Sequence, residues 1–195
     1  MVPKGYPYNS VGVGRKKESP LIREIKYSFK NKYNLQYIVN VEQYQYDIFI
    51  VKFHLADHSN SKWRYCYLTK QGDARRIIFT CVEIGLEIYS KFPNASFGFI
   101  GNPTKKEIKI RKFDNTKRYK AYQNFAKFFF DPNVFEHIYN NEKSTYILLN
   151  RKKKEDTKDL LKSIIKMFET HYDIENIYSG LMYEPPKKKN QAKAK

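Results

Sequence analysis

The sequence predicts an α+β fold in which an antiparallel meander sheet carries helices mainly on one face. Between residues 35 and 69, apolar side chains alternate along three segments, as they do in strands. Between 73 and 92, apolar residues recur at spacings of three and four, which is typical of an amphipathic helix. The expected order is β-β-β-α-β-α, followed by a small β-β-α unit.

The first three strands differ in how they are expected to be buried. Residues 35–42 are apolar mainly on one face, which indicates a half-buried strand. Residues 46–55 are apolar on both faces, which indicates an inner strand. In 62–69, Trp63 and Tyr67 belong to an aromatic set at alternate positions. This segment is therefore predicted to return antiparallel as the third strand.

Two helices and one strand are expected next. Asp73 is a suitable N-cap for the first helix, which ends at Pro93. Residues 95–100 form the fourth strand, and a second helix covers about 116–130, capped by Asp114 or Thr116.

The C-terminal part is predicted to be a smaller unit. Residues 134–139 and 145–149 form a hairpin, and residues 155–172 form a third helix with acidic residues in its first turn.

The domain organisation follows from composition. Residues 1–20 indicate a flexible basic arm, 21–183 a single α+β domain, and 184–195 a disordered Lys-rich tail. The pattern over 21–32 suits either a short helix or an alternating strand.

The formal charge of +17 is distributed unevenly. Residues 33–100 hold seven Lys or Arg against six Asp or Glu, which leaves only +1. The excess therefore lies in the arm, in 105–120, in 151–154 and in the tail. A balanced body with cationic extensions attracts nucleic acid or an anionic membrane surface, although an excess of Lys can also serve solubility alone.

The compartment is predicted from what the chain lacks. No apolar run has the length of a membrane span, and the residues after Met1 include no hydrophobic signal region. Cys66 and Cys81 stand where small apolar side chains are expected. This pattern is typical of free cysteines in a reducing compartment. We expect a cytoplasmic protein without a membrane partner.

The candidate binding segment begins where the fourth strand meets the turn Gly101-Asn102-Pro103-Thr104. A strand end, a turn and a helix N-terminus that carries cations form a plausible anion site. Alternation over 106–113 indicates an additional exposed strand or hairpin arm. Tyr119 and Tyr122 could stack on bases only if exposed, and the inward stripe of the helix places Tyr122 in the core. The predicted nucleic-acid-binding residues are Lys105, Lys106, Lys109, Arg111, Lys112, Lys117, Arg118, Tyr119 and Lys120.

The middle of the chain resembles an uncharacterised bacterial family of small α+β proteins. The residues that carry the resemblance are Gly72-Asp73, Phe92-Pro93-Asn94-Ala95, Gly101-Asn102-Pro103-Thr104 and Thr116-Lys117-Arg118-Tyr119. In that family the turn runs almost directly into the helix, whereas here residues 105–114 intervene. The resemblance implies a fold rather than an activity.

Other chemistry has weaker support in the sequence. His54 and His58 have no third His or Cys at the spacing of a metal site. Asp57 and Asp73 are explained as a turn residue and a helix cap. Neither a metal site nor a cofactor is therefore predicted. A metal-independent ribonuclease needs a base, an acid and a cation. The residues available for these roles are His54, His58 and His137 with Lys70, Arg75 or Arg76.

The sequence therefore predicts a non-enzymatic protein that binds RNA or DNA through the 105–120 segment and both tails. The many Tyr and Phe residues favour RNA or single strands. The alternatives are a toxin-like ribonuclease and a structural subunit of a nucleoprotein assembly, in which other subunits would be partners.

Overall fold

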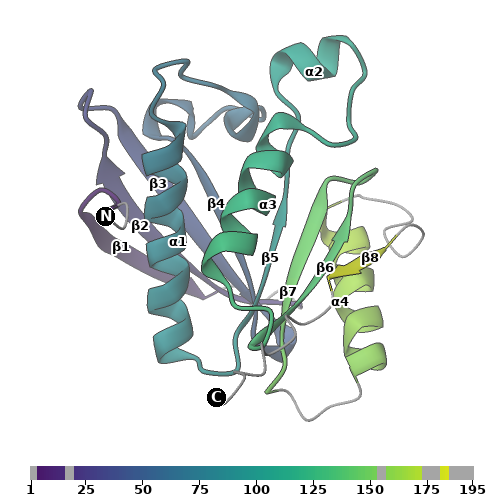
Figure 1. Cartoon of the computed structure of the whole chain (residues 1–195). Coiled ribbons are helices and arrows are strands. Elements are labelled where there is room, and N and C mark those ends of the chain that lie inside the picture. Colours follow the sequence, from purple (N-terminus) through teal and green to yellow (C-terminus); the bar gives the residue numbers. More distant parts are fainter. Residues whose placement is uncertain (1–3, 16–19, 153–156, 173–180, 185–195) are drawn as a thin grey trace, which may run out of the picture.

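The computed structural model describes residues 4–15, 20–152, 157–172 and 181–184, and these form an α+β fold. Eight strands make one sheet in the order β1-β2-β3-β4-β5-β7-β6-β8. Every neighbouring pair for which a register is given is antiparallel except β4 and β5, which run parallel. Figure 1 shows the sheet with helices packed against it.

The N-terminal half of the sheet is a meander of four strands. These are β1 (Tyr8–Arg15), β2 (Leu21–Lys30), β3 (Gln36–Tyr44) and β4 (Ile48–Leu55). The prediction of a flexible arm was therefore wrong for β1, and the ambiguous segment after it is a strand. β1 lacks the alternating apolar pattern of a buried strand, since its valines Val11 and Val13 are exposed. Its backbone pairing with β2 forms the strand instead. Of the predicted arm over 1–20, residues 1–3 and 16–19 lie outside the described residues.

The predicted strand at 62–69 was also wrong. These residues belong to the loop that follows β4, which contains the short 3-10 turns Ala56–His58 and Arg64–Cys66. The Cys66 nitrogen donates to the Trp63 carbonyl over 2.7 Å. The next neighbour of β4 is instead β5 (Ser96–Ile100), so β4 is an inner strand as predicted. Helix α1 (Ala74–Lys91) makes the crossover between these parallel strands.

Helices α1 and α3 (Lys117–Phe129) cover one face of the sheet, and the short α2 (Lys105–Lys109) lies at one end of the molecule (Figure 1). The predicted hairpin arm over 106–113 was wrong, because α2 begins with a complete capping box between Thr104 and Glu107. Asp73 precedes α1 but makes no side-chain cap bond; its carboxylate instead accepts from the Tyr6 hydroxyl, which lies 2.8 Å from each carboxylate oxygen.

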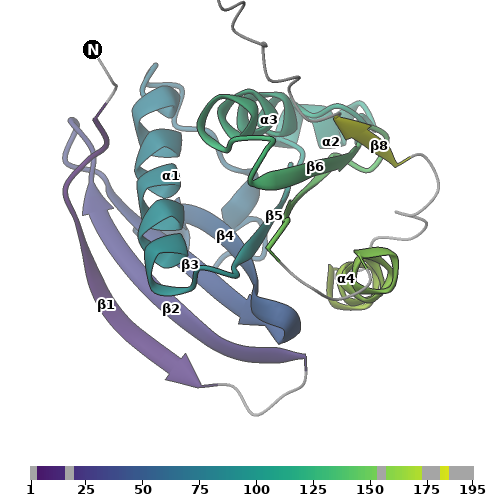
Figure 2. The same ribbon diagram turned by 60° about the horizontal axis from the view of Figure 1, so that its bottom comes forward.

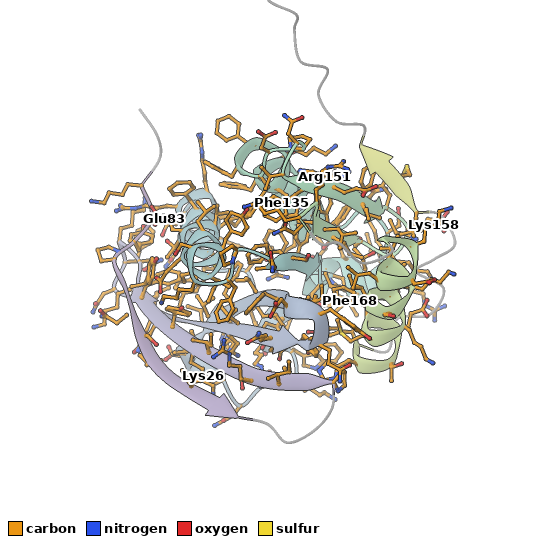
Figure 3. The ribbon with its side chains drawn as sticks, turned by 90° about the horizontal axis from the view of Figure 1, so that it is seen from below. Lys26, Glu83, Phe135, Arg151, Lys158 and Phe168 are labelled. Atoms are coloured by element: carbon orange, nitrogen blue, oxygen red, sulfur yellow. The ribbon has the colours of Figure 1, made fainter. Side chains whose placement is uncertain are left out.

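Helix α4 (Thr157–Tyr172) packs on the opposite face, so the sheet separates two apolar cores (Figure 2). Strands β6 (Phe135–Asn140) and β7 (Thr145–Asn150) form the predicted hairpin. In β7, Leu148 belongs to the core under α1 and α3, and Leu149 to the core under α4. Figure 3 labels one residue of each core, Phe135 and Phe168.

The C-terminal edge of the sheet is β8 (Met182–Glu184), which pairs with β6 and carries the ordered sheet to residue 184. The predicted tail beyond it lies outside the described residues. Among the described residues, no helix has the length and hydropathy needed to cross a bilayer.

Candidate nucleic-acid interface

The sequence-predicted binding segment lies at one end of the sheet. Because β4 and β5 are parallel, their carboxyl ends meet there, and α1 and α3 both begin at this end (Figure 1). In sheets with parallel strands, ligands are commonly bound beyond the carboxyl ends of those strands. The loop after β4 and helix α2 surround this end.

The turn after β5 and the start of α3 are in direct contact, although residues 105–114 separate them in sequence. The Thr116 hydroxyl donates to the Gly101 carbonyl over 2.6 Å and accepts from the Tyr119 nitrogen over 3.2 Å. Thr116 rather than Asp114 is therefore the N-cap of α3. Gly101 is required because a Cβ at this position would lie 2.3 Å from the Tyr119 Cβ.

The expected anion position between this turn and α3 is filled by a carboxylate of the chain itself. Glu107 is 3% exposed, and its carboxylate accepts from the backbone nitrogens of Thr104 and Lys117 at 2.8 and 2.9 Å. Burial opposes ionisation of this carboxyl, but these hydrogen bonds outweigh it, so the pKa of Glu107 lies below its ordinary value. The N-terminus of α3 is thus satisfied internally.

Lysines gather instead on an adjacent hollow of about 450 Å³. We call it the lysine hollow and define it by Lys70, Lys105, Lys106, Lys109 and Lys117, with Cys66, Tyr67, Leu68 and Thr104 completing its lining. The loop after β4, helix α2 and the first turn of α3 each contribute at least one lysine. Four of the nine predicted binding residues are therefore brought together. Lys70 was named in the sequence only as a candidate ribonuclease cation.

The lysine hollow has no carboxylate in its lining. Among the described residues, none of its five ammonium groups forms an ion pair. The acidic side chain of α2, Glu107, is engaged with backbone nitrogens instead. Glu107 attracts the Lys117 ammonium, which helps to lower the pKa of Glu107, and the hollow as a whole presents a net positive charge to solvent.

Tyr67 forms an aromatic wall of the lysine hollow. The Lys105 Nζ lies 4.2 Å from the centre of its ring, and the His58 ring lies 4.0 Å from it, centre to centre. Hydrogen bonding to Ser61, and then to Lys105, lowers the pKa of the Tyr67 phenol. The contact with Lys105 is a cation–π arrangement.

Two of the predicted residues have structural roles. Arg118 donates to the carbonyls of Asn102 and Tyr67, which fastens the loop after β4 to α3. Tyr119 is fully buried, and its hydroxyl donates to the Asn141 side chain over 2.8 Å. A ring in this position does not reach a bound base. Tyr122, which the inward stripe placed in the core, is half-buried.

The remaining predicted residues, Arg111, Lys112 and Lys120, do not line the hollow. Arg111 ends α2 with a φ of 53°, a left-handed conformation that favours glycine. The Lys112 nitrogen donates to the Glu107 carbonyl over 2.9 Å, which completes a Schellman-type helix end.

The three histidines of the ribonuclease hypothesis are held by separate contacts, and His58 packs against Tyr67 at the wall of the lysine hollow. His137 is fully buried, with its ring nitrogens bonded to the Tyr146 hydroxyl and the Phe130 carbonyl. His54 is buried, and burial lowers its pKa. The described residues contain no cluster of three metal-ligating side chains.

No protein-family model matches the chain, and neither the curated proteins nor the solved structures searched give a match. The resemblance to a bacterial α+β family therefore stays a prediction.

Proposed function

We propose that the protein binds nucleic acid without catalysis, holding backbone phosphates in the lysine hollow. The observation that supports this is the convergence of five lysines from three segments on one hollow whose lining contains no carboxylate. Each ammonium group that neutralises a phosphate releases condensed counterions, which drives binding and makes it salt-dependent. We also propose a cytoplasmic location, which the free thiols Cys66 and Cys81 support.

The lysine hollow replaces most of the predicted segment as the proposed interface. Lys105 and Lys109 lie one helical turn apart on α2, and both are exposed. Arg118 supports the interface by fixing its loop, and Arg111, Lys112 and Lys120 would add only longer-range attraction.

Charge reversal at Lys105→Glu with Lys109→Glu tests the proposal. Binding of a fluorescein-labelled single strand of about 20 nucleotides is followed by anisotropy between about 50 and 200 mM salt. Loss of two phosphate contacts should flatten the slope of log K against log salt by about 1.4, because each contact on a single strand contributes about 0.7.

The matched control is Lys162→Glu with Lys166→Glu. Both residues are exposed on α4, on the opposite face of the sheet, and the change in net charge is the same. The control should keep the slope of the unaltered protein. Equal losses in both double variants would show that net charge alone drives binding, and unchanged binding in the α2 variant would exclude the lysine hollow.

A further inference from the structure

A second depression adjoins the lysine hollow and has a different character. This apolar groove, of about 270 Å³, shares Tyr67, Leu68 and Lys117 with the hollow. Its walls are mainly apolar and aromatic, and include Tyr37, Phe53, Ile77, Ala121 and Tyr122. A cationic site and an aromatic site thus lie side by side, joined by three residues.

The apolar groove also contains a few polar groups. His54, Arg64 and Arg118 belong to its lining. The Arg64 Nη1 donates to the Ser59 carbonyl over 3.1 Å, whereas its Nε is buried and has no hydrogen-bond acceptor among the described residues. The guanidinium groups of Arg64 and Arg118 carry N–H donors beside the apolar walls, so a ligand with acceptor atoms would find hydrogen-bond partners there.

We propose that the apolar groove receives an unstacked base of a single-stranded nucleic acid whose phosphates lie in the lysine hollow. The inference rests on the proposed function and narrows it to single strands. A nucleobase matches both features of the groove, since it has apolar faces and carries ring nitrogens and carbonyl oxygens that accept hydrogen bonds. A base inside a duplex is stacked and paired, so it must first be extruded to enter.

Three DNA probes with the same number of phosphates separate the two contributions. They are a single strand, a strand of equal length in which every nucleotide is abasic, and a duplex whose total phosphate number equals that of the strands. The unaltered protein should bind the single strand at least about tenfold more tightly than the abasic strand, since base–aromatic contacts contribute about 1–3 kcal/mol per base. It should also prefer the single strand to the duplex.

Ala121→Leu tests the place of the base, because the larger side chain fills the groove from α3. The variant should bind the single strand and the abasic strand alike, with its affinity for the abasic strand unchanged. The control is Asn124→Leu on the same helix, where the side chain is exposed and does not line the groove. This variant should keep the preference for bases.

The outcomes separate this inference from the proposed function. Failure to bind either strand would overturn both. Equal binding of both strands by the unaltered protein would overturn the base site alone, and this comparison stands even if Ala121→Leu does not fold. A base preference that survives Ala121→Leu and disappears in Trp63→Ala would place stacking on the exposed Trp63 ring and overturn the groove.

Discussion

The Lys117 backbone nitrogen, at the start of α3, donates to the Glu107 carboxylate over 2.9 Å. Through this bond helix α2 is fastened to α3 by its own acidic side chain. The same carboxylate accepts from the Thr104 nitrogen over 2.8 Å, so the turn, α2 and α3 meet at one buried group. The lysines of α2 are thereby held beside Lys117, and the positive charge of the hollow comes from ammonium groups rather than from a free helix end.

Glu107→Gln should destabilise the protein by roughly 1.5–3 kcal/mol, because it weakens charge-assisted hydrogen bonds at a buried site. Urea unfolding measures the loss. Glu142→Gln, at an exposed turn residue, should leave the unfolding midpoint unchanged. A Glu107→Gln midpoint equal to that of the unaltered protein would contradict the role of this carboxylate.

Acid should remove the same contribution. The folded-state pKa of Glu107 is depressed, because the hydrogen bonds from Thr104 and Lys117 outweigh burial. Its contribution is therefore fully present above the ordinary glutamate pKa and is lost as pH falls through the lower, folded-state pKa. The unaltered protein should lose more stability than Glu107→Gln between neutral pH and about pH 3. Parallel pH profiles for the two proteins would refute this linkage.

Gly101→Ala should be strongly destabilising. The added Cβ would lie 2.3 Å from the Tyr119 Cβ and 2.6 Å from its Cα, and backbone atoms in a packed helix cannot move cheaply. Overpacking of this kind costs about 1–3 kcal/mol or more, seen as a lower thermal midpoint. Gly12→Ala in β1 is the control, since nothing lies within 4 Å of the Cβ it would add. A small effect at Gly101 would show that the turn and α3 are not in close contact.

Tyr119→Phe separates a core role from base stacking. The substitution removes the hydroxyl that donates to Asn141 and should cost about 1 kcal/mol of stability, without changing affinity for a single strand. Chemical denaturation and anisotropy measure the two quantities. Tyr119→Leu, which also removes the ring, should likewise leave affinity unchanged in the fraction that folds. If Tyr119→Leu lowered the affinity for a single strand and Tyr119→Phe did not, the Tyr119 ring would have to contact the nucleic acid.

Arg111→Gly should stabilise the protein by about 1 kcal/mol, because glycine adopts the left-handed conformation at this position without strain. Affinity should fall only slightly, since Arg111 does not line the lysine hollow. The comparison variant is Lys109→Ala, which removes a lysine of the hollow. Alanine is used because Lys109 lies within α2, where glycine would also destabilise the helix. A loss with Arg111→Gly as large as with Lys109→Ala would extend the interface to the end of α2.

Local sequence patterns were sufficient for most of the regular elements. Helices α1, α3 and α4 follow from apolar spacing, because each buries one continuous stripe against the sheet. Strands β3 to β7 follow from alternation, which reflects burial on one or both faces. The lysines of the 105–120 segment were recognised from charge alone.

Two segments misled the sequence reading for physical reasons. The aromatic residues Trp63, Tyr65 and Tyr67 stand at alternate positions and so mimic a strand. The local hydrogen bond from the Cys66 nitrogen to the Trp63 carbonyl closes a 3-10 turn instead. The alternation over 106–113 likewise mimics an exposed strand. There the capping box of Thr104 and Glu107 satisfies the backbone and favours a helix.

By itself the sequence determined that a charge-balanced α+β body carries its positive excess in a few segments, because burial periodicity and composition are local properties. Only the tertiary structure decided which lysines act together. Lys70 is distant in sequence from Lys105 and Lys117, and it joins them because β4 and β5 are parallel and bring both following segments to the same end of the sheet. It also decided that Tyr119 is buried and that Glu107 fills the anion position, since both depend on contacts between residues far apart in the chain or on opposite sides of a turn.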